Sequence, residues 1–411
     1  MMDGGSRLAI DGGPPARSRP DRYRVLTPGA SWMGRAEETA VSEVLRRRVL
    51  YRYWGSAVAA FEDRLSASLG DETKVLAVNS GSSALQLAFA ALDLPAGSEV
   101  LLPTWGFVSA ATTARSAGLV PRFAPVDRSL TIDVADAATL LTPRTGAILA
   151  VHPFGSACDL TAVEALARET GARVIEDVAQ AHGATYRGQA LGTVGDIAAF
   201  SLQFFKLVST GEGGFLATRR PELFARAFAM HDAAALWTAP ELFATTERLA
   251  AGPGNFRMSE IEGALGLVQL KRLDDTIERM RRIRNELDGV VTEAGAVLRP
   301  HADAAGEVGS NLIFYCDDAV AAEWTVSALR AEGVGATSLL GVPGTNRHWA
   351  ADWTPVLERC GIEPPAAEVI ARDRSLLAVG VQVGIDPRYT ATDIAETRLA
   401  LEKVLPAAKR A

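Results

Sequence analysis

The stretch "SLQFFKLVSTGEGG", Ser201–Gly214, places one lysine after two phenylalanines and before a glycine-rich turn. Lysine is scarce in this chain, because only five of its 42 basic residues are lysines. The other four lie in a polar turn, on a charged helix or in the C-terminal tail, whereas Lys206 follows the apolar run "IAAFSLQFF". Burial lowers the pKa of a lysine and makes its amine a nucleophile or a Schiff-base partner. A buried stem whose ammonium reaches water is the competing interpretation, and this stretch alone leaves both open.

The composition is that of an ordinary globular protein. The chain has 411 residues, 48% of them hydrophobic and 22% charged, which is enough for about two domains. Its net charge of −7 argues against a nucleic-acid or anionic-membrane surface. Three cysteines without a CxxC pair predict neither a disulfide framework nor a metal site. With no apolar run of about 18 residues and no leader-like N-terminus, we expect a cytoplasmic protein.

Short strand-like runs alternate with helical stretches through the first half of the chain. The six runs are "KVLAV", "EVLLP", "PRFAPV", "AILAV", "RVIED" and "IAAFSL". This alternation predicts an α/β fold with a largely parallel sheet. A capping box of Ser259 and Glu262 opens a predicted long helix over about 259–288, which would link two domains. The expected divisions are an N-terminal arm, a large domain and a smaller C-terminal α/β domain, at 1–30, 31–265 and 266–411.

Polar or glycine-rich residues follow four of these runs, at the edge where open α/β sheets bind ligands. After "KVLAV", Gly81 and Ser82 open an apolar helix, whose first amides could hold a phosphate or could serve only as an ordinary cap. After "EVLLP" come Trp105 and Phe107, which could stack on a planar ring or pack in the core. These two segments predict a ligand edge without specifying the ligand.

The other two strand ends add charge. Asp177 and Gln180 follow "RVIE" one helical turn apart, and Gln203 and Lys206 follow "IAAFSL". A carboxylate that ends a buried strand is unfavourable unless a cation meets it, either a protonated pyridine nitrogen or a nearby arginine. A phosphate cradle, a stacking ring, a carboxylate and a buried lysine together indicate pyridoxal 5'-phosphate (PLP), whose ring acts as an electron sink.

Long segments of the chain resemble the sugar and cyclitol aminotransferases of the DegT/StrS type, which are PLP-dependent enzymes of fold type I. The most specific block runs from "RVIEDVAQAHGA" to "FKLVSTGEGG", and "NSGSSALQLAFAAL" and "GNFRMSEIEGALGLVQL" match as well. The resemblance covers nearly the whole chain. It implies a large domain with a mostly parallel central sheet, a smaller C-terminal α/β domain, PLP as cofactor, and a homodimer with shared active sites.

The resemblance also implies roles for single residues around the PLP ring. Lys206 would carry the cofactor as an imine and then shuttle a proton to and from the substrate carbon. Asp177 would pair with the pyridine nitrogen, Gln180 would lie near the phenolic oxygen, and Phe107 would stack on the ring. Lysine at position 206 places the chain with the transaminases, because some relatives that act as dehydratases have histidine there.

At the phosphate end the resemblance implies a site shared between two subunits. Three residues of one chain would bind the phosphate: Gly81, Ser82 and Ser201. Asn255, in "GNFRM", would reach the phosphate in the neighbouring subunit. His182 would support the site, and His152 would be structural.

The expected reaction transfers an amino group from L-glutamine or L-glutamate to a keto-cyclitol or keto-sugar, in secondary-metabolite (antibiotic) biosynthesis. "FSLQ" replaces the common "FSFH", and its Gln203 is similar to the cyclitol and aminobenzoate-forming branch. The alternative is a nucleotide-sugar aminotransferase, with arginines such as Arg52 and Arg388 on the diphosphate. A non-catalytic PLP-binding regulatory protein is the alternative of another class. A dinucleotide oxidoreductase would need a GxGxxG turn, which "NSGSSA" lacks.

Substrate contacts are expected from four residues: Tyr53, Trp54, Trp105 and Gln203. The aromatic loop "YRYWG" could hold a hydroxylated ring by stacking and hydrogen bonds, or could pack at a domain edge. The segment "LLAVGVQVGID" departs from the family pattern in a region that lines the substrate pocket of relatives. This departure bears on which acceptor the enzyme uses.

Overall fold

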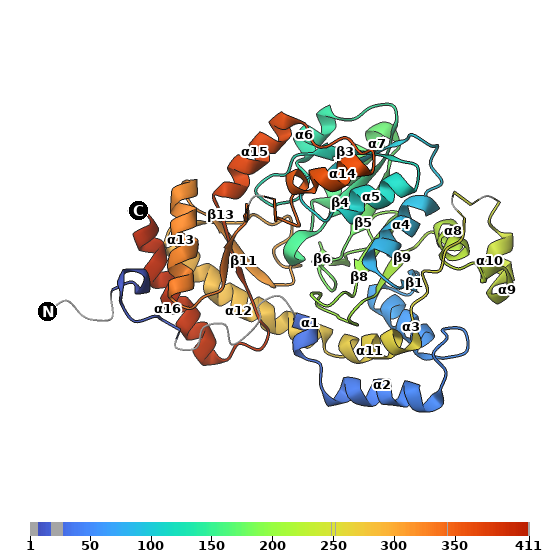
Figure 1. Cartoon of the computed structure of the whole chain (residues 1–411), viewed down its shortest axis with the longest axis horizontal. Coiled ribbons are helices and arrows are strands. Elements are labelled where there is room, and N and C mark those ends of the chain that lie inside the picture. The colour runs from blue at the N-terminus through green and yellow to red at the C-terminus, as the bar shows by residue number, and fades with distance from the viewer. Residues whose placement is uncertain (1–6, 18–27, 248, 251, 343, 410–411) are drawn as a thin grey trace.

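The computed structural model of the protein describes residues 7–17, 28–247, 249–250, 252–342 and 344–409. A central seven-stranded sheet and a second, four-stranded sheet organise these residues (Figure 1). The strands of the central sheet are β1 (Lys74–Val78), β2 (Glu99–Pro103), β3 (Val120–Ala124), β4 (Thr145–Val151), β5 (Arg173–Asp177), β8 (Ile197–Ser201) and β9 (Gly214–Thr218). Their order across the sheet is β1-β9-β8-β5-β4-β2-β3.

Six of these strands are the six runs predicted from the sequence, and they run parallel to one another. Strand β9 was not predicted; it lies between β1 and β8 and is antiparallel to both. Its five residues follow directly on the glycine-rich turn, so no separate signal marked them as a strand. The register pairs Phe200 with Phe215, and their stacked rings lie 4.1 Å apart between centroids.

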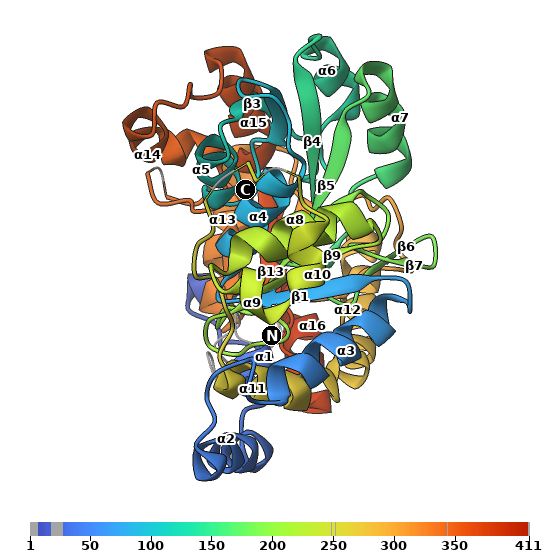
Figure 2. The ribbon, with the colours of Figure 1, turned by 90° about the vertical axis from the view of Figure 1, so that its right-hand side faces the viewer.

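Helices cover both faces of the central sheet, which explains why its strands are apolar on both sides. Along β1, Val75 and Ala77 belong to one apolar cluster, whereas Leu76 and Val78 belong to the other. Figure 2 shows α5 and α7 on opposite sides of the sheet. The covering helices are α4 (Gly81–Ala91), α5 (Ser109–Ser116) and α8 (Pro221–His231) on one face, and α3 (Ala57–Leu69) and α7 (Leu160–Thr170) on the other.

The second sheet is antiparallel throughout and lies beside the central sheet (Figure 1). Its strands, in order, are β10 (Val297–Leu298), β11 (Asn311–Tyr315), β13 (Gly380–Gly384) and β12 (Ala336–Ser338), and its helices are α12 (Leu273–Glu293), α13 (Ala319–Ala331) and α16 (Ala391–Ala408). Residues 7–17, which include the 3-10 turn η1 (Ala9–Asp11), pack on these helices, and Arg17 pairs with Asp393 at 3.0 Å. The rest of the predicted arm within 1–27 lies outside the described residues.

The prediction of a single long helix over about 259–288 is wrong. The structure has two helices, α11 (Glu260–Leu270) and α12, with a break at Lys271–Arg272. The predicted capping box at the start of α11 is present. Leu270 and Leu273 are both buried and three positions apart, whereas the predicted stripe residues Ile261, Leu265 and Val268 are only half-buried. Helix α11 packs on α2 (Arg35–Arg47) and α3, whereas α12 packs on the second sheet and α16.

The remaining elements are short connections and edge helices. They are α1 (Pro28–Ser31), α6 (Val134–Thr139), α9 (Ala235–Thr238), α10 (Pro240–Ala244), α14 (Thr354–Arg359), α15 (Ala367–Ala378), the 3-10 turns η2 (Pro153–Gly155) and η3 (Ala350–Trp353), and the ribbon of β6 (Thr185–Tyr186) and β7 (Gln189–Ala190). Within the described ranges, no helix combines the length and the apolar character that crossing a membrane requires. The domain boundaries at residues 30 and 265 stay predictions.

Candidate active site

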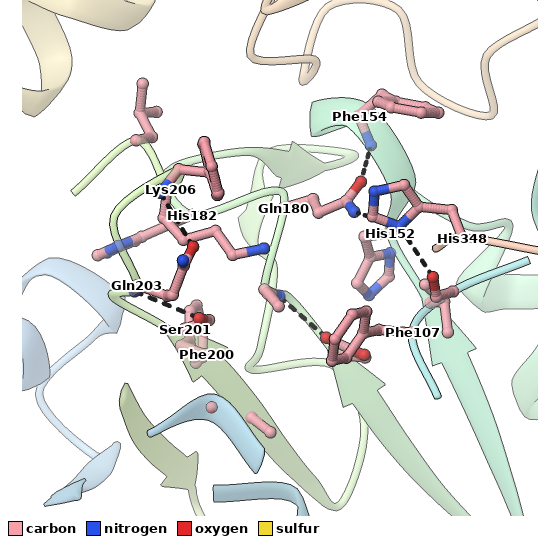
Figure 3. Close-up of a pocket in the computed structure, with 18 of the residues that line it drawn as sticks. Phe107, His152, Phe154, Gln180, His182, Phe200, Ser201, Gln203, Lys206 and His348 are labelled. Carbon is pink, nitrogen blue, oxygen red and sulfur yellow. Dashed lines mark hydrogen bonds between the residues drawn. The ribbon is translucent and has the colours of Figure 1, made fainter. Parts of the chain in front are cut away.

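A cavity of about 440 Å³ opens between the two sheets, at the carboxyl ends of β4, β5 and β8 (Figure 3). Strand ends and the first turn of α4 form one wall, and Val308, Ser310, Asn311 and Ile385 close it from the side of the second sheet. The cavity is therefore at the edge that the strand pattern predicted. Eight of the predicted site residues line it: Gly81, Ser82, Phe107, Asp177, Gln180, Ser201, Gln203 and Lys206.

The first turn of α4 forms one end of the cavity. The N-cap Ser80 accepts a hydrogen bond from the Ser83 amide at 3.0 Å, so the amides of Gly81 and Ser82 remain directed outward from the helix start. A Cβ atom at Gly81 would lie 2.8 Å from Cβ of Ser201, so a side chain there would push the helix away from β8. Outward amides, two serine hydroxyls and the positive end of a helix fit a phosphate.

Asp177 ends β5 in the middle of the cavity wall and is 5% exposed. Its Oδ1 accepts a hydrogen bond from the Ala179 amide at 3.0 Å. Burial raises the pKa of this carboxyl, while the Ala179 N–H and the positive charge of Lys206 oppose the rise. A carboxylate can accept several hydrogen bonds, so Asp177 retains capacity toward the cavity. A protonated ring nitrogen would supply the cation that a buried carboxylate requires.

Lys206 lies in the turn that follows β8. The turn is closed by two bonds to Gln203, whose carbonyl accepts from the Lys206 amide at 2.8 Å and whose Oε1 accepts from the Phe205 amide at 3.0 Å. Burial lowers the pKa of the Lys206 ammonium, Asp177 opposes this effect, and the charge of Arg347 adds to it. The amine is thus neutral more often than an ordinary surface lysine and can act as a nucleophile or base.

The end of the predicted N-terminal arm contacts this turn, a contact that was not predicted. The Gly29 amide of α1 donates to the Lys206 carbonyl at 3.2 Å. A Cβ atom at Gly29 would lie only 2.7 Å from the same carbonyl oxygen. The backbone of α1 therefore rests directly on the backbone of the lysine turn.

Gln180 and His348 lie next to each other in the cavity wall, with Gln180 Nε2 3.4 Å from His348 Nδ1, and Phe107 and Lys206 line the same cavity (Figure 3). Gln180 Oε1 accepts from the Phe154 amide at 2.9 Å, which fixes the orientation of its side-chain amide. His348 Nδ1 lies 2.9 Å from the Gly106 carbonyl and must carry the proton there. That nitrogen cannot also accept from Gln180, so Gln180 Nε2 is left to donate toward the cavity.

The three histidines of the cavity wall differ in their surroundings. Burial lowers the pKa of His182 and of His348 to about 4, so both rings are neutral at pH 7. His152 Nε2 lies 3.2 Å from the buried Glu176 Oε2, and its Nδ1 accepts from the Cys158 amide at 3.0 Å. Because both nitrogens of His152 are bonded within the protein, its geometry fits the expected structural role.

Two expected substrate residues pack within the protein instead of lining the cavity. Trp105 is 2% exposed, and its ring lies 6.0 Å from that of Phe154. We therefore correct its role: it packs behind the cavity wall, whereas Phe107, which is 45% exposed, faces the cavity. Tyr53 packs against the apolar cluster on the α4 face of the sheet. Arg52, considered for a diphosphate, instead pairs with Glu62 at 2.8 Å inside the protein.

Asn255 and Trp54 lie on the protein surface, outside the cavity of their own chain. The main-chain oxygen of Asn255 accepts from Asn79 Nδ2 at 3.5 Å, next to the phosphate end of the site. Trp54 is 81% exposed and packs edge-on against Tyr51 at 5.7 Å. The Arg257 guanidinium lies 5.5 Å from the same Tyr51 ring. Tyr51 thus contacts both Trp54 and Arg257, and the exposed Asn255 is two residues before Arg257 in the chain.

Arg347 and His348 also line the cavity, although neither was predicted as a site residue. They come from the loop between β12 and η3, in the segment "GTNRHW". The only signal was the presence of a basic and an imidazole side chain in a glycine-containing loop. Such loops are common, and nothing local indicates which strand ends the loop approaches.

The chain is similar to known proteins both in its sequence and in its fold. Residues 32–349 match the model of the DegT/DnrJ/EryC1/StrS aminotransferase family. The chain is 32% identical over 392 residues to an L-glutamine:2-deoxy-scyllo-inosose aminotransferase of Streptomyces paromomycinus, covering 93% of this chain and 88% of the relative. It is 29% identical to the GDP-perosamine synthase of Caulobacter vibrioides, covering 75% and 85%. The structure of DesI in the presence of its TDP-sugar product superposes with a TM-score of 0.78 at 27% identity, covering 98% and 97%.

Proposed function

Because this chain belongs to the DegT/DnrJ/EryC1/StrS aminotransferase family, we propose that it transfers an amino group from L-glutamine to a keto-cyclitol. The family is PLP-dependent, and the chain is an aminotransferase of the sugar and cyclitol type and not a non-catalytic PLP-binding protein. One observation carries the residue assignment. Lys206 and Asp177 line the same cavity, and the charge of each shifts the pKa of the other.

The residues of the cavity would bind PLP from its phosphate to its ring. Phosphate contacts would come from Gly81, Ser82 and Ser201, and ring contacts from Phe107, Asp177 and Gln180. When bound, PLP supplies an electron sink for the charge that develops on the substrate carbon. Asp177 would hold the ring-nitrogen proton. Lys206 Nζ, whose lowered pKa favours the neutral amine, would take the proton from the substrate α-carbon and return it to the carbon on the far side of the transferred nitrogen.

A hydroxylated ring is supported as the acceptor by Gln203. Its Oε1 already accepts from the Phe205 amide, so the Nε2 group remains to donate to a substrate hydroxyl at the cavity wall. The relative that aligns over 93% of the chain acts, by its name, on 2-deoxy-scyllo-inosose with L-glutamine. A nucleotide-linked keto-sugar is the second candidate, favoured by the similarity to GDP-perosamine synthase and to DesI with its TDP-sugar product.

We further propose that the reaction belongs to secondary metabolism and takes place in the cytoplasm, where the three unpaired cysteines would stay reduced.

Separate half-reactions test both substrates. The PLP-loaded enzyme is mixed with single amino acids, and the visible absorbance of the cofactor reports its conversion to the amino form. We expect L-glutamine to convert it and a keto-cyclitol to restore the starting spectrum. If L-glutamate reacts and L-glutamine does not, the proposed donor is wrong. If only nucleotide-linked keto-sugars restore the spectrum, the second candidate replaces the cyclitol.

We also propose that the active unit is a homodimer in which each site uses Asn255 of the other chain. Asn255 is exposed and lies outside its own cavity, although it adjoins the phosphate end through Asn79. Apolar side chains are also accessible on α2, which packs on α11, and nearby: Leu45 and Leu50 are about half exposed, and the α11 residues Ile261, Leu265 and Val268 are half-buried. A second copy would cover this face by two-fold symmetry.

Subunit exchange between two inactive variants tests the shared site. Lys206→Ala and Asn255→Ala proteins should each be nearly inactive alone. After equal mixing and full exchange, half of the dimers are mixed, and each of these has one intact site. Activity should then return to about a quarter of the wild-type value. Absence of recovery, with exchange confirmed by differently tagged chains, would place Asn255 in the site of its own subunit.

A further inference from the structure

We propose that Arg347 binds the α-carboxylate of the amino donor, an inference that rests on the proposed aminotransferase function. The donor must present its amino group at Lys206 and carries a carboxylate on the same carbon. Arg347 lines the cavity and acts electrostatically on Lys206. A guanidinium pairs with a carboxylate through two parallel hydrogen bonds, which fix orientation as well as position.

Apart from Lys206, one positively charged side chain among the described residues of the cavity wall can bind the donor carboxylate. Among the described residues that line the cavity, the lysine and arginine side chains are Lys206 and Arg347. His182 and His348 are neutral at pH 7 because burial lowers the pKa of each to about 4. The Arg347 guanidinium lies 5.9 Å from the centre of the Phe205 ring, and no carboxylate of the described chain lies within 4 Å of it. It is therefore a cation at the cavity that still lacks an anionic partner within those residues.

The backbone around Arg347 is held from several sides, although its side chain is exposed. Trp353 Nε1 donates to the Arg347 carbonyl at 2.9 Å, and the Gly106 amide donates to the next carbonyl, that of His348, at 2.8 Å. Asn346 Oδ1 accepts from the His348 amide at 3.0 Å, and Asn346 Nδ2 donates to the Leu339 carbonyl at 2.8 Å. These bonds hold the backbone of Arg347 at the edge of the cavity that its side chain lines.

A diphosphate of a nucleotide-linked acceptor is the other oxyanion that could meet Arg347. The two ligands differ in their distance from the reacting carbon. The carboxylate of an amino acid is bonded to the carbon that bears the amino group, whereas a whole sugar ring separates the diphosphate from the keto carbon. The Arg347 guanidinium lies 5.9 Å from the centre of the ring of Phe205, which directly precedes Lys206, and its charge lowers the pKa of the Lys206 ammonium. This proximity favours the carboxylate.

Two donors and three variants test the assignment. Arg347→Gln should raise the concentration of L-glutamine that half-saturates the donor half-reaction by about 10- to 100-fold, the range for loss of charge-assisted hydrogen bonds. The amide of γ-aminobutyric acid, which is glutamine without its α-carboxylate, should react equally with the wild-type protein and with Arg347→Gln. Arg347→Lys should recover part of the affinity. Arg374→Gln is the matched control, because Arg374 also lies over an aromatic ring, that of Trp349 at 5.0 Å, but outside the cavity.

Calorimetry provides a readout that needs no turnover. Glutaramate, which is glutamine without its amino group, should bind the wild-type protein and Arg374→Gln, and should bind Arg347→Gln at least about tenfold more weakly. Equal binding to all three proteins would overturn the assignment. The assignment would also be overturned if Arg347→Gln impaired only the acceptor half-reaction, because Arg347 would then bind the acceptor and not the donor. If no amino acid converts wild-type enzyme, the proposed function fails, and glutaramate binding still decides whether Arg347 holds a carboxylate.

Discussion

Replacing Lys206 with alanine is expected to lower the rate of amino transfer by about 10²–10⁴-fold, the contribution of a positioned general acid–base group. The variant should also lose covalent retention of PLP, because we propose the Lys206 amine, which lines the cavity and has a lowered pKa, as the nucleophile that binds the cofactor. Reduction of the loaded wild-type enzyme with borohydride should fix the cofactor on the peptide that contains Lys206. Mass spectrometry of the digested protein identifies that peptide.

The exposed Lys271, at the break between α11 and α12, is the matched control for this substitution. Lys271→Ala should keep activity and borohydride labelling. Labelling of any lysine other than Lys206 would contradict the assignment. The lowered pKa of Lys206 adds a pH test: recombination of the cofactor-free protein with PLP should accelerate as pH rises and its ammonium loses a proton, with a midpoint below that of an ordinary lysine. Arg347→Gln should shift this midpoint upward, because it removes a positive charge that lowers the pKa.

Substituting asparagine for Asp177 should lower activity by about 10²–10³-fold, which is typical when an electrostatic group aimed at developing charge is removed. Asparagine preserves the shape and can still accept from the Ala179 amide, but it cannot hold the ring-nitrogen proton as a carboxylate does. PLP should therefore still bind, with an absorbance that responds differently to pH. Steady-state kinetics and a spectroscopic pH titration of the loaded variant measure the two effects separately.

A stability measurement distinguishes this role of Asp177 from a purely structural one. Burial raises the pKa of the carboxyl, so its charged form is unfavourable in the empty protein. Without cofactor, Asp177→Asn should thus unfold at a temperature no lower than that of the wild type. Asp177→Ala, which also loses the bond from Ala179, serves as the comparison. Near-normal turnover of Asp177→Asn together with a clear loss of stability would make Asp177 a structural residue.

Much of the fold and of the candidate site could be predicted, because the relevant signals are local. Each predicted strand is a short apolar run followed by its own polar end, and parallel strands carry those ends to one edge of the sheet. Asp177 and Lys206 could therefore be placed together, although they come from different strands. The strand β9 and the break at Lys271–Arg272 could not be predicted, since they depend on distant packing partners.

By itself, the sequence determined the six parallel strands, the edge of the sheet that binds ligands, and strand-end residues at that edge such as Asp177 and Lys206. Only the tertiary structure showed that Phe107 faces the cavity and that Trp105 packs in the core. The two residues lie in an irregular turn, which has no regular periodicity from which the direction of each side chain could be predicted. It also brought Arg347 and His348 to the site from the second half of the chain. The shifted pKa values of Asp177 and Lys206 arise in the same way, since burial and neighbouring charges exist only once distant segments have packed together.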